Sequence, residues 1–234
     1  MVTDIISPAS FRHEKKFIVS HLSRYEIESI VKLHPAMFSE IYYQRFVNNI
    51  YFDTVNMSNY ISNLSGISHR LKARIRWYGE LFGLIEKPVL ELKIKKGFLG
   101  SKVRFPLESF CLDNNYLQEV QQDIFAKAKV PDILAEYLKL LRFTLLNRYS
   151  RRYFESADKK FRITIDFGME AFRIDPISNS FIEIIVDRNN TILELKYSEE
   201  SDEEAGFTTN CLPFRMTKSS KYATGIESIY PLRF

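Results

Sequence analysis

The segment Ser68–Tyr78 carries a basic side chain on every second residue. Arg70, Lys72, Arg74 and Arg76 alternate with Leu71, Ala73, Ile75 and Trp77. Because successive side chains of a β-strand point to opposite faces, this segment is predicted to be a strand with one basic face and one apolar face. The apolar face must be buried. The four cations repel one another, so an anionic group is expected to compensate for them.

Five other segments repeat this division into a charged or polar face and an apolar face. Their charged or polar faces are formed by Arg12, Glu14 and Lys16; by Glu91, Lys93 and Lys95; by Tyr149 and Arg151; by Arg162, Thr164 and Asp166; and by Glu194 and Lys196. These faces either form an open, solvated sheet surface or line the inside of a closed barrel. A barrel of about eight strands normally fills its interior with side chains or a ligand. A charged interior is stable only if its ions are paired or bind a ligand.

The remaining pattern places helices between strands. Strands are predicted at Phe11–Ser20, Phe46–Thr54, Ser68–Tyr78, Val89–Lys96, Lys102–Pro106, Asn147–Phe154, Phe161–Phe167, Ile182–Val186 and Thr191–Tyr197. Helices are predicted at Ser23–His34, Met57–Asn63, within Glu108–Lys129 and at Pro131–Leu145, and Asp202–Glu204 is expected to end a surface loop. The predicted fold is α+β: a closed antiparallel β-barrel of about eight strands that forms a charged tunnel, with helices packed on the outside.

Length and composition favour one domain over residues 1–234. The chain has 234 residues, of which 45% are hydrophobic, with no Pro/Gly/Ser-rich linker and no internal repeat. A net charge of +4 does not by itself indicate nucleic-acid binding, so no nucleic-acid partner is expected. Neither GxGxxG nor GxxxxGK[ST] occurs, so phosphate would have to be bound without those glycine-rich loops.

The cysteines and histidines show no metal-site spacing. Cys111 and Cys211 are far apart and have no CxxC partner, and no HExxH occurs. The sequence contains no apolar stretch of the roughly 18 residues that a membrane span needs. A cytoplasmic protein that does not insert into a membrane is therefore expected.

The chemistry of the charged faces indicates the ligand. Guanidinium and ammonium groups suit phosphate oxygens. Carboxylates suit Mg²⁺ or Mn²⁺ held between protein and phosphates. The sequence therefore predicts a phosphate chain bound together with a divalent metal.

The ordered motifs also resemble a known family. Arg12-x-Glu14-x-Lys16, Lys72-x-Arg74-x-Arg76, Glu91-x-Lys93, Tyr149-x-Arg151, Glu194-x-Lys196 and Lys218-Ser-Ser-Lys-Tyr222 resemble, in order, the strand motifs of the triphosphate tunnel metalloenzymes, which have a CYTH-like fold. Within that group they most resemble the catalytic domain of the vacuolar transporter chaperone (VTC) polyphosphate polymerases. The resemblance extends from about residue 10 to residue 226.

The resemblance assigns roles to individual residues. It implies that Lys16, Arg74, Arg76, Lys93, Arg151 and Lys221 contact phosphates as catalytic groups, that Tyr149 and Ser220 donate hydrogen bonds to phosphate oxygens, and that Glu194 holds the metal. Arg12, Lys72, Lys196 and Lys218 are further candidate phosphate-binding residues that would line the tunnel.

Three other carboxylates are candidate metal ligands, each with an alternative. Asp166 is either a second ligand or the salt-bridge partner of Arg162. Glu91 either binds the metal or holds Lys93 in position. Glu14 either binds the metal or pairs with Lys16 or Arg12. The wider tunnel family carries ExExK in its first strand, and here Arg12 replaces the first glutamate, which favours a polymerase over a hydrolase.

The expected function is transfer of the γ-phosphate of ATP onto a growing inorganic polyphosphate chain. Such an enzyme would need Mn²⁺ or Mg²⁺, would bind ATP and polyphosphate, and would hand its product to a membrane-protein partner if one exists. Two alternatives remain open at this stage: a tripolyphosphatase or nucleoside triphosphatase with the same tunnel, and a non-catalytic polyphosphate sensor.

Overall fold

The computed structural model describes residues 12–96, 99–114, 118–175 and 180–230. Its strands are β1 (Arg12–Val19), β2 (Ser39–Asp53), β3 (His69–Tyr78), β4 (Gly83–Ile85), β5 (Val89–Lys96), β6 (Leu99–Pro106), β7 (Phe110–Leu112), β8 (Arg142–Glu155), β9 (Phe161–Asp175), β10 (Ser180–Asp187) and β11 (Thr191–Ser198). Its helices are α2 (Arg24–Lys32), α3 (Ser58–Leu64), α4 (Gln118–Ala126), α5 (Asp132–Lys139), the 3-10 helix η1 (Glu199–Ser201), α6 (Asp202–Asn210) and α7 (Lys221–Ile229).

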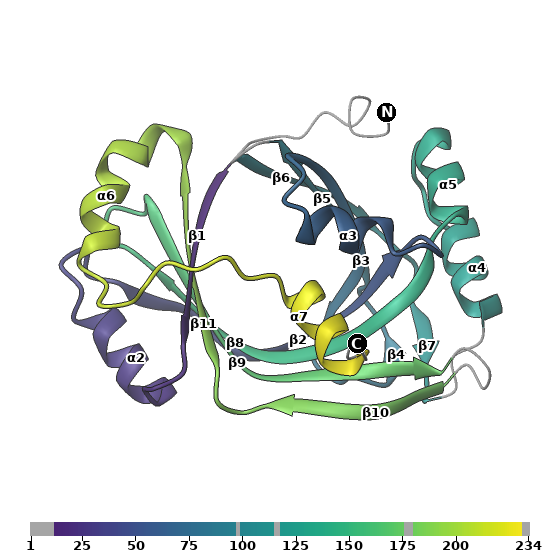
Figure 1. Cartoon of the computed structure of the whole chain (residues 1–234), viewed down its shortest axis with the longest axis horizontal. Helices are drawn as coiled ribbons and strands as arrows, with labels where there is room; N and C mark the ends of the chain where they lie inside the picture. The colour runs from purple at the N-terminus through teal and green to yellow at the C-terminus, as the bar shows by residue number, and fades with distance from the viewer. Residues whose placement is uncertain (1–11, 97–98, 115–117, 176–179, 231–234) are drawn as a thin grey trace.

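Most strands belong to one antiparallel sheet. Its order is β10-β9-β11-β1-β6-β5-β3-β2-β8, and β9 also pairs with β8. Because β9 lies near one end of this order and β8 forms the other, their pairing curls the sheet into an antiparallel half-barrel (Figure 1). The predicted α+β class with a strongly curved sheet is therefore confirmed.

Closure of the barrel is not confirmed. In the described residues, β1 and β6 share one register pair, Arg12 with Gly100, whereas β1 pairs with β11 along its whole length. The two strands diverge after that pair (Figure 1). The closed barrel expected from the sequence is thus an open half-barrel at this position, and side chains rather than a backbone ladder connect its two edges: Lys93 of β5 donates to Glu14 of β1.

The apolar faces of the strands lie outside, as the alternation predicts. Ile75, Trp77, Leu92 and Leu193 are buried, and Leu71 is partly buried. Helices cover these faces in two groups, with α4 and α5 packing over β3 and β5, and α2 and α6 packing over β1 and β11 (Figure 1). Burial of these side chains from water is the main stabilising contribution to such a sheet.

Helix α7 is placed differently from the outer helices. It lies against β8 and β9 on the side from which Figure 1 is viewed. Tyr222 stacks on Tyr51 of β2 and donates a hydrogen bond of 2.7 Å to the buried Asp53. A Cβ atom on Gly225 would lie 2.6 Å from a methyl group of Leu145, so glycine permits this close approach to β8. Helix α7 therefore brings Lys221 onto the charged face.

Several element boundaries differ from the prediction. The helix expected over Pro131–Leu145 ends at Lys139, because Leu145 pairs with Tyr51 in the β2–β8 ladder. The loop expected to end at Asp202–Glu204 is wrong, since these residues begin α6 and their carboxylates favour a helix N-terminus. The sequence patterns also did not predict α7 or the two-stranded β4–β7 pair.

Candidate functional site

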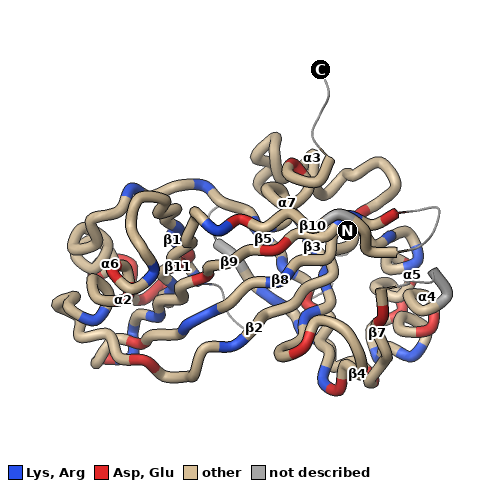
Figure 2. Tube along the Cα trace, turned by 90° about the horizontal axis from the view of Figure 1, so that it is seen from below, with Lys and Arg blue, Asp and Glu red and all other residues tan. Residues whose placement is uncertain are grey.

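Charged side chains of β1, β3, β5, β6, β8, β9 and β11 lie on the inner, concave face of the half-barrel. Figure 2 shows Lys, Arg, Asp and Glu interspersed along β1, β8, β9 and β11. The alternation in sequence explains this, because the outward positions of the same strands are apolar. We call this set of inward-facing residues the inner face.

On β3 and β5 the inner face is organised around Glu91. Its carboxylate accepts hydrogen bonds from Arg74 Nε at 2.9 Å and from Arg104 Nε at 3.1 Å, and Arg76 Nη1 lies 3.7 Å away. Burial works to raise the pKa of Glu91, but Arg74 and Arg76 outweigh it and lower the pKa strongly. Glu91 is therefore an ionised partner of arginines. It does not contact Lys93, so that alternative for Glu91 is wrong.

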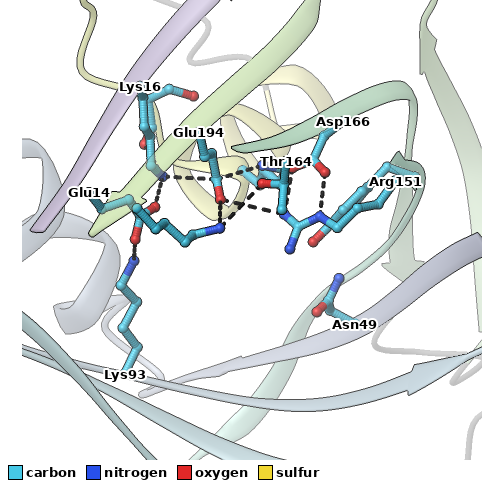
Figure 3. Close-up of polar contacts among 12 residues, drawn as sticks. Glu14, Lys16, Asn49, Lys93, Arg151, Thr164, Asp166 and Glu194 are labelled. Carbon is cyan, nitrogen blue, oxygen red and sulfur yellow. Dashed lines mark hydrogen bonds and ion pairs between the residues drawn. The ribbon is translucent and has the colours of Figure 1, made fainter. Parts of the chain in front are cut away.

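On β1 and β11 the inner face is organised around Glu194. Its carboxylate lies 2.7 Å from Lys196 Nζ, 3.1 Å from Lys221 Nζ and 3.4 Å from Lys16 Nζ (Figure 3). Burial works to raise its pKa, but these lysines lower the pKa well below its ordinary value. Lys16 Nζ also lies 3.1 Å from Glu14, so one ammonium group bridges the two glutamates.

Asp166 completes this part of the network. It accepts two hydrogen bonds from Arg151, and Lys221 Nζ lies 2.6 Å from its Oδ2 atom. The predicted pairing of Asp166 with Arg162 is wrong, because Arg162 donates to Glu155 at 2.8 Å. Register explains the difference, since Arg151 is directly opposite Asp166 in the β8–β9 ladder.

Arg76 is fixed by neutral side chains. Its Nε atom donates to Asn49 Oδ1 at 2.9 Å, and its Nη2 atom donates to Tyr149 Oη at 3.1 Å. Asn49 in turn donates to Asn147 at 2.9 Å. These buried side chains are neutral, so they orient the guanidinium, and Glu91 at 3.7 Å is the carboxylate that it approaches.

Helix α7 and its N-cap complete the inner face near Lys72. Lys72 Nζ donates to Ser220 Oγ and to Asn63 Oδ1, each at 2.8 Å. Ser220 also accepts from Ala223 N, which caps α7. Arg12 and Lys218 are exposed, and neither joins the ion-pair network of the described residues.

Basic side chains outnumber acidic ones on the inner face. The cations include Lys16, Arg45, Arg70, Lys72, Arg74, Arg76, Lys93, Lys95, Lys102, Arg104, Arg151, Lys196 and Lys221, and the carboxylates include Glu14, Asp53, Glu91, Asp166 and Glu194. Burial, together with Lys16 and Lys93, lowers the pKa of Lys72 to about 7. Burial also lowers the pKa of Lys102 well below its ordinary value, and in the described part of the chain no ion pair or hydrogen bond reaches its ammonium group. The carboxylates of the inner face therefore do not balance its positive charge.

A divalent metal fits this site only together with its ligand. In the described ranges no three His, Cys, Asp or Glu side chains lie close enough together to hold an ion. Mg²⁺ normally needs only one or two protein carboxylates when substrate phosphates and water supply the other oxygens. Glu14 and Glu194, already bridged by one cation at Lys16, satisfy that requirement.

The sequence-based site was incomplete on β2 and β6. Lys102 and Arg104 face inward from β6, opposite Lys93 and Glu91. Lys102 and Arg104 alternate with Val103 and Phe105, which is the pattern of a strand with one charged face. Two charged residues alone are too few to assign such a face from the sequence. Asn49 and Tyr51 of β2 were missed because uncharged residues do not reveal a polar face by charge alternation.

Comparison with solved structures identifies the fold. The chain is similar to a proposed adenylyl cyclase from Hippeastrum with a dominant triphosphatase activity (14% identity, TM-score 0.51, 95% of this chain and 97% of that one). It is also similar to a proposed adenylate cyclase from Bacillus halodurans (13%, TM-score 0.52, 90% and 94%). A third similar structure is a protein from Pyrococcus horikoshii OT3, with 13% sequence identity and a TM-score of 0.51, over 93% of this chain and 99% of that one. At 13–14% identity these likenesses show a shared fold.

The sequence identifies the family within that fold. Residues 11–230 match the VTC domain, so the chain belongs to the VTC domain family and the resemblance is confirmed. A comparison with curated proteins gives no match. No helix in the described ranges is both long enough and apolar enough to span a bilayer.

Proposed function

We propose that this chain is a polyphosphate polymerase that transfers the γ-phosphate of ATP to the end of an inorganic polyphosphate chain, with Mn²⁺ or Mg²⁺ as cofactor. The observation that carries the proposal is the surplus of cations on the inner face. Lys72 and Lys102 have no carboxylate within ion-pair distance in the described part of the chain. Burial, together with neighbouring cations, lowers the pKa of both ammonium groups. A phosphate chain would supply compensating negative charge.

The reaction needs little covalent chemistry from the protein. A terminal oxygen of the polyphosphate attacks the γ-phosphorus of ATP, the bond from that phosphorus to the β–γ bridging oxygen breaks, and ADP leaves with the electron pair. The attacking oxygen is already ionised at neutral pH, so no general base is required. Phosphoryl transfer of this kind depends mainly on alignment and charge stabilisation.

The contacts of each inner-face residue indicate which role it would have in binding the phosphate chain. Arg76 and Arg151 are held rigidly, by Asn49 and Asp166, and would bind phosphate oxygens in a fixed orientation. Arg74, Lys93 and Lys16 would bind the same chain from the facing strands, while Lys221, Tyr149 and Ser220 would bind it near α7. Lys72 and Lys196 would add charge, and the exposed Arg12 and Lys218 would contact parts of the chain that extend outward.

The carboxylates would hold the metal once phosphates attract the lysines away from them. Glu194 and Glu14 contact mainly lysines and are the best placed ligands, whereas Glu91 is paired with arginines and Asp166 with Arg151 and Lys221. When bound, the metal would neutralise charge on the phosphate oxygens and polarise the γ-phosphorus.

Hydrolysis is the competing function. Related tunnel enzymes act on triphosphates, and the Hippeastrum neighbour has a dominant triphosphatase activity. A hydrolase has to position water, which favours a carboxylate-rich floor. Here cations dominate, and Arg12 stands where a glutamate is expected, so the balance of charge favours holding a long polyanion.

Product stoichiometry separates these functions. Purified protein with ATP and Mn²⁺ or Mg²⁺ is followed for ADP and orthophosphate in the same samples. A polymerase releases ADP in clear excess over orthophosphate, because the transferred phosphate stays in the polymer. Equal release of both indicates a nucleoside triphosphatase, and release of orthophosphate from tripolyphosphate but not from ATP indicates a tripolyphosphatase. Binding of tripolyphosphate without release of any product from either compound indicates a sensor.

A further inference from the structure

An arginine surrounded by three tyrosine rings lies on the inner face beyond the ion-pair network. Arg45 Cζ is 5.0 Å from the ring centroid of Tyr42, 4.6 Å from that of Tyr78 and 4.7 Å from that of Tyr153. Tyr42 and Tyr153 also contact each other edge to face, with centroids 5.6 Å apart. We call these four residues the Arg45 cluster.

A β-bulge in β2 assembles the cluster. In the β2–β8 ladder, Tyr42 is opposite Tyr153 and Arg45 is opposite Arg151, with a register shift between the two pairs. Without an extra residue, strand alternation would place Tyr42 and Arg45 on opposite faces. The bulge turns both toward Tyr153, and bulges are common where a strand directs side chains to a functional site.

The cluster continues the phosphate-binding part of the inner face. The Tyr153 ring is close to two guanidinium groups: its centroid is 4.7 Å from Arg45 Cζ and 5.8 Å from Arg151 Cζ. Tyr78 follows Arg76 by two residues on β3, and it is about 20 Å along that strand from Lys72, which contacts the α7 cap. The cluster is therefore at the end of the inner face away from α7.

The cluster is suited to an aromatic ligand rather than to structural packing alone. Tyr42 and Tyr78 are 53% and 49% exposed. Arg45 Nε is buried and has no hydrogen-bond partner among the described residues. Exposed tyrosine rings beside an arginine form a platform on which flat heteroaromatic rings stack, and such stacking tolerates any base.

We propose that the Arg45 cluster binds the nucleobase of the nucleotide donor, which stacks on Tyr42 and Tyr78 while its phosphates extend past Arg45 toward Arg151 and Arg76. The proposal rests on the proposed function in one respect: the donor must be a nucleotide. The proposal fixes the orientation of the bound nucleotide. Its nucleoside lies at the Arg45 cluster, and its γ-phosphate lies among the ion pairs nearer α7.

The test compares a ligand that has a base with one that lacks it. Isothermal titration calorimetry measures binding of ATP and of inorganic tripolyphosphate to the whole chain and to its Tyr42→Ala and Tyr78→Ala variants. Loss of one stacking ring should weaken ATP binding about 5- to 100-fold, and tripolyphosphate binding should stay within about twofold. Tyr78→Phe keeps the ring and should retain ATP binding. Tyr43→Ala removes the neighbouring ring, which is 94% exposed and makes no ring contact in the described part of the chain, and should change neither ligand.

Two results would overturn the inference. Equal weakening of ATP and tripolyphosphate would show that the cluster supports the fold or binds phosphate, and unchanged ATP binding in both alanine variants would show that no base stacks there. Both leave the polymerase proposal standing, because tripolyphosphate binding and polymer formation by the wild-type protein test that separately. Melting temperatures of the variants identify any that fail to fold. Comparing Tyr78→Phe, which keeps the ring, with Tyr78→Ala, which loses it, then isolates the effect of the ring.

Discussion

Lys221, the first residue of α7, places its Nζ atom 3.1 Å from Glu194 Oε1 on β11, in a buried contact. The same ammonium group lies 2.6 Å from Asp166 on β9. One lysine thus joins a helix from the end of the described chain to two strands of the sheet. Its contacts oppose the effect of burial, and its pKa is raised above the ordinary lysine value.

Lys221→Met should therefore destabilise the free protein. Loss of a buried partner costs about 3 to 5 kcal/mol when the remaining charge is left unpaired. Here Asp166 keeps Arg151, and Glu194 keeps Lys16 and Lys196. We therefore expect a loss of up to about 3 kcal/mol, which corresponds to a melting temperature lower by up to roughly 12 °C for a chain of this length. Lys160→Met removes an exposed pair with Glu204, which solvent screens, and should leave the melting temperature nearly unchanged. Thermal unfolding of both variants measures the difference, and equal loss in the two would contradict the account.

Lys102→Met should have the opposite effect on stability. Burial disfavours the charged form of Lys102, and Arg74 and Arg76 oppose the attraction of Glu91, which makes no ion pair with its ammonium group. Replacing Lys102 by an apolar side chain therefore removes a burial penalty and this repulsion. At pH 6 we expect a melting temperature at or a few degrees above that of the wild type, and weaker tripolyphosphate binding. A variant that is less stable yet binds tripolyphosphate normally would show that Lys102 is a structural residue.

The pH dependence of ligand binding should reflect Lys72. Its pKa in the folded protein is about 7, below the ordinary value of 10.5, so the unfolded chain binds more protons between these values and the free energy of unfolding rises with pH there. A bound polyanion favours protonated Lys72, so tripolyphosphate affinity should fall as pH rises above about 7. Titrations from pH 6 to 9 with wild type and Lys72→Met measure this, and the variant should show a shallower fall. Identical profiles would exclude Lys72 as the titrating group.

Glu194→Gln should separate metal binding from phosphate binding. Glu194 is surrounded by Lys16, Lys196 and Lys221, so loss of its charge increases the positive potential of the inner face. We expect metal-dependent turnover to fall about 10- to 100-fold and tripolyphosphate to bind as well as or better than before. Glu40→Gln, which removes a carboxylate paired with Arg152 on the outer face, is the matched control. Normal turnover in Glu194→Gln would show that Glu14 or another carboxylate, and not Glu194, is the metal ligand.

Charge alternation predicted the parts of the site in which strands are regular. Arg74 and Arg76 on β3, Glu91 on β5 and Glu194 on β11 all face inward because a period of two is fixed by strand geometry. Charge alternation could not predict the Arg45 cluster, because the bulge between Tyr42 and Arg45 places two residues of odd spacing on the same face. It also misassigned the partner of Asp166, because cross-strand register depends on long-range pairing. The open edge between β1 and β6 similarly depends on how far two distant strands remain paired.

The length of the polyphosphate product tests the central claim most directly. Wild-type protein is incubated with ATP, a short polyphosphate primer and Mn²⁺ or Mg²⁺, and the products are separated on a gel beside size standards. Arg76→Ala, which lacks the guanidinium held by Asn49 and Tyr149, is the inactive control. The account predicts chains longer than the primer with wild type and not with the variant. Orthophosphate as the sole product, with the primer shortened or unchanged across metals, would contradict the polymerase proposal and favour hydrolysis.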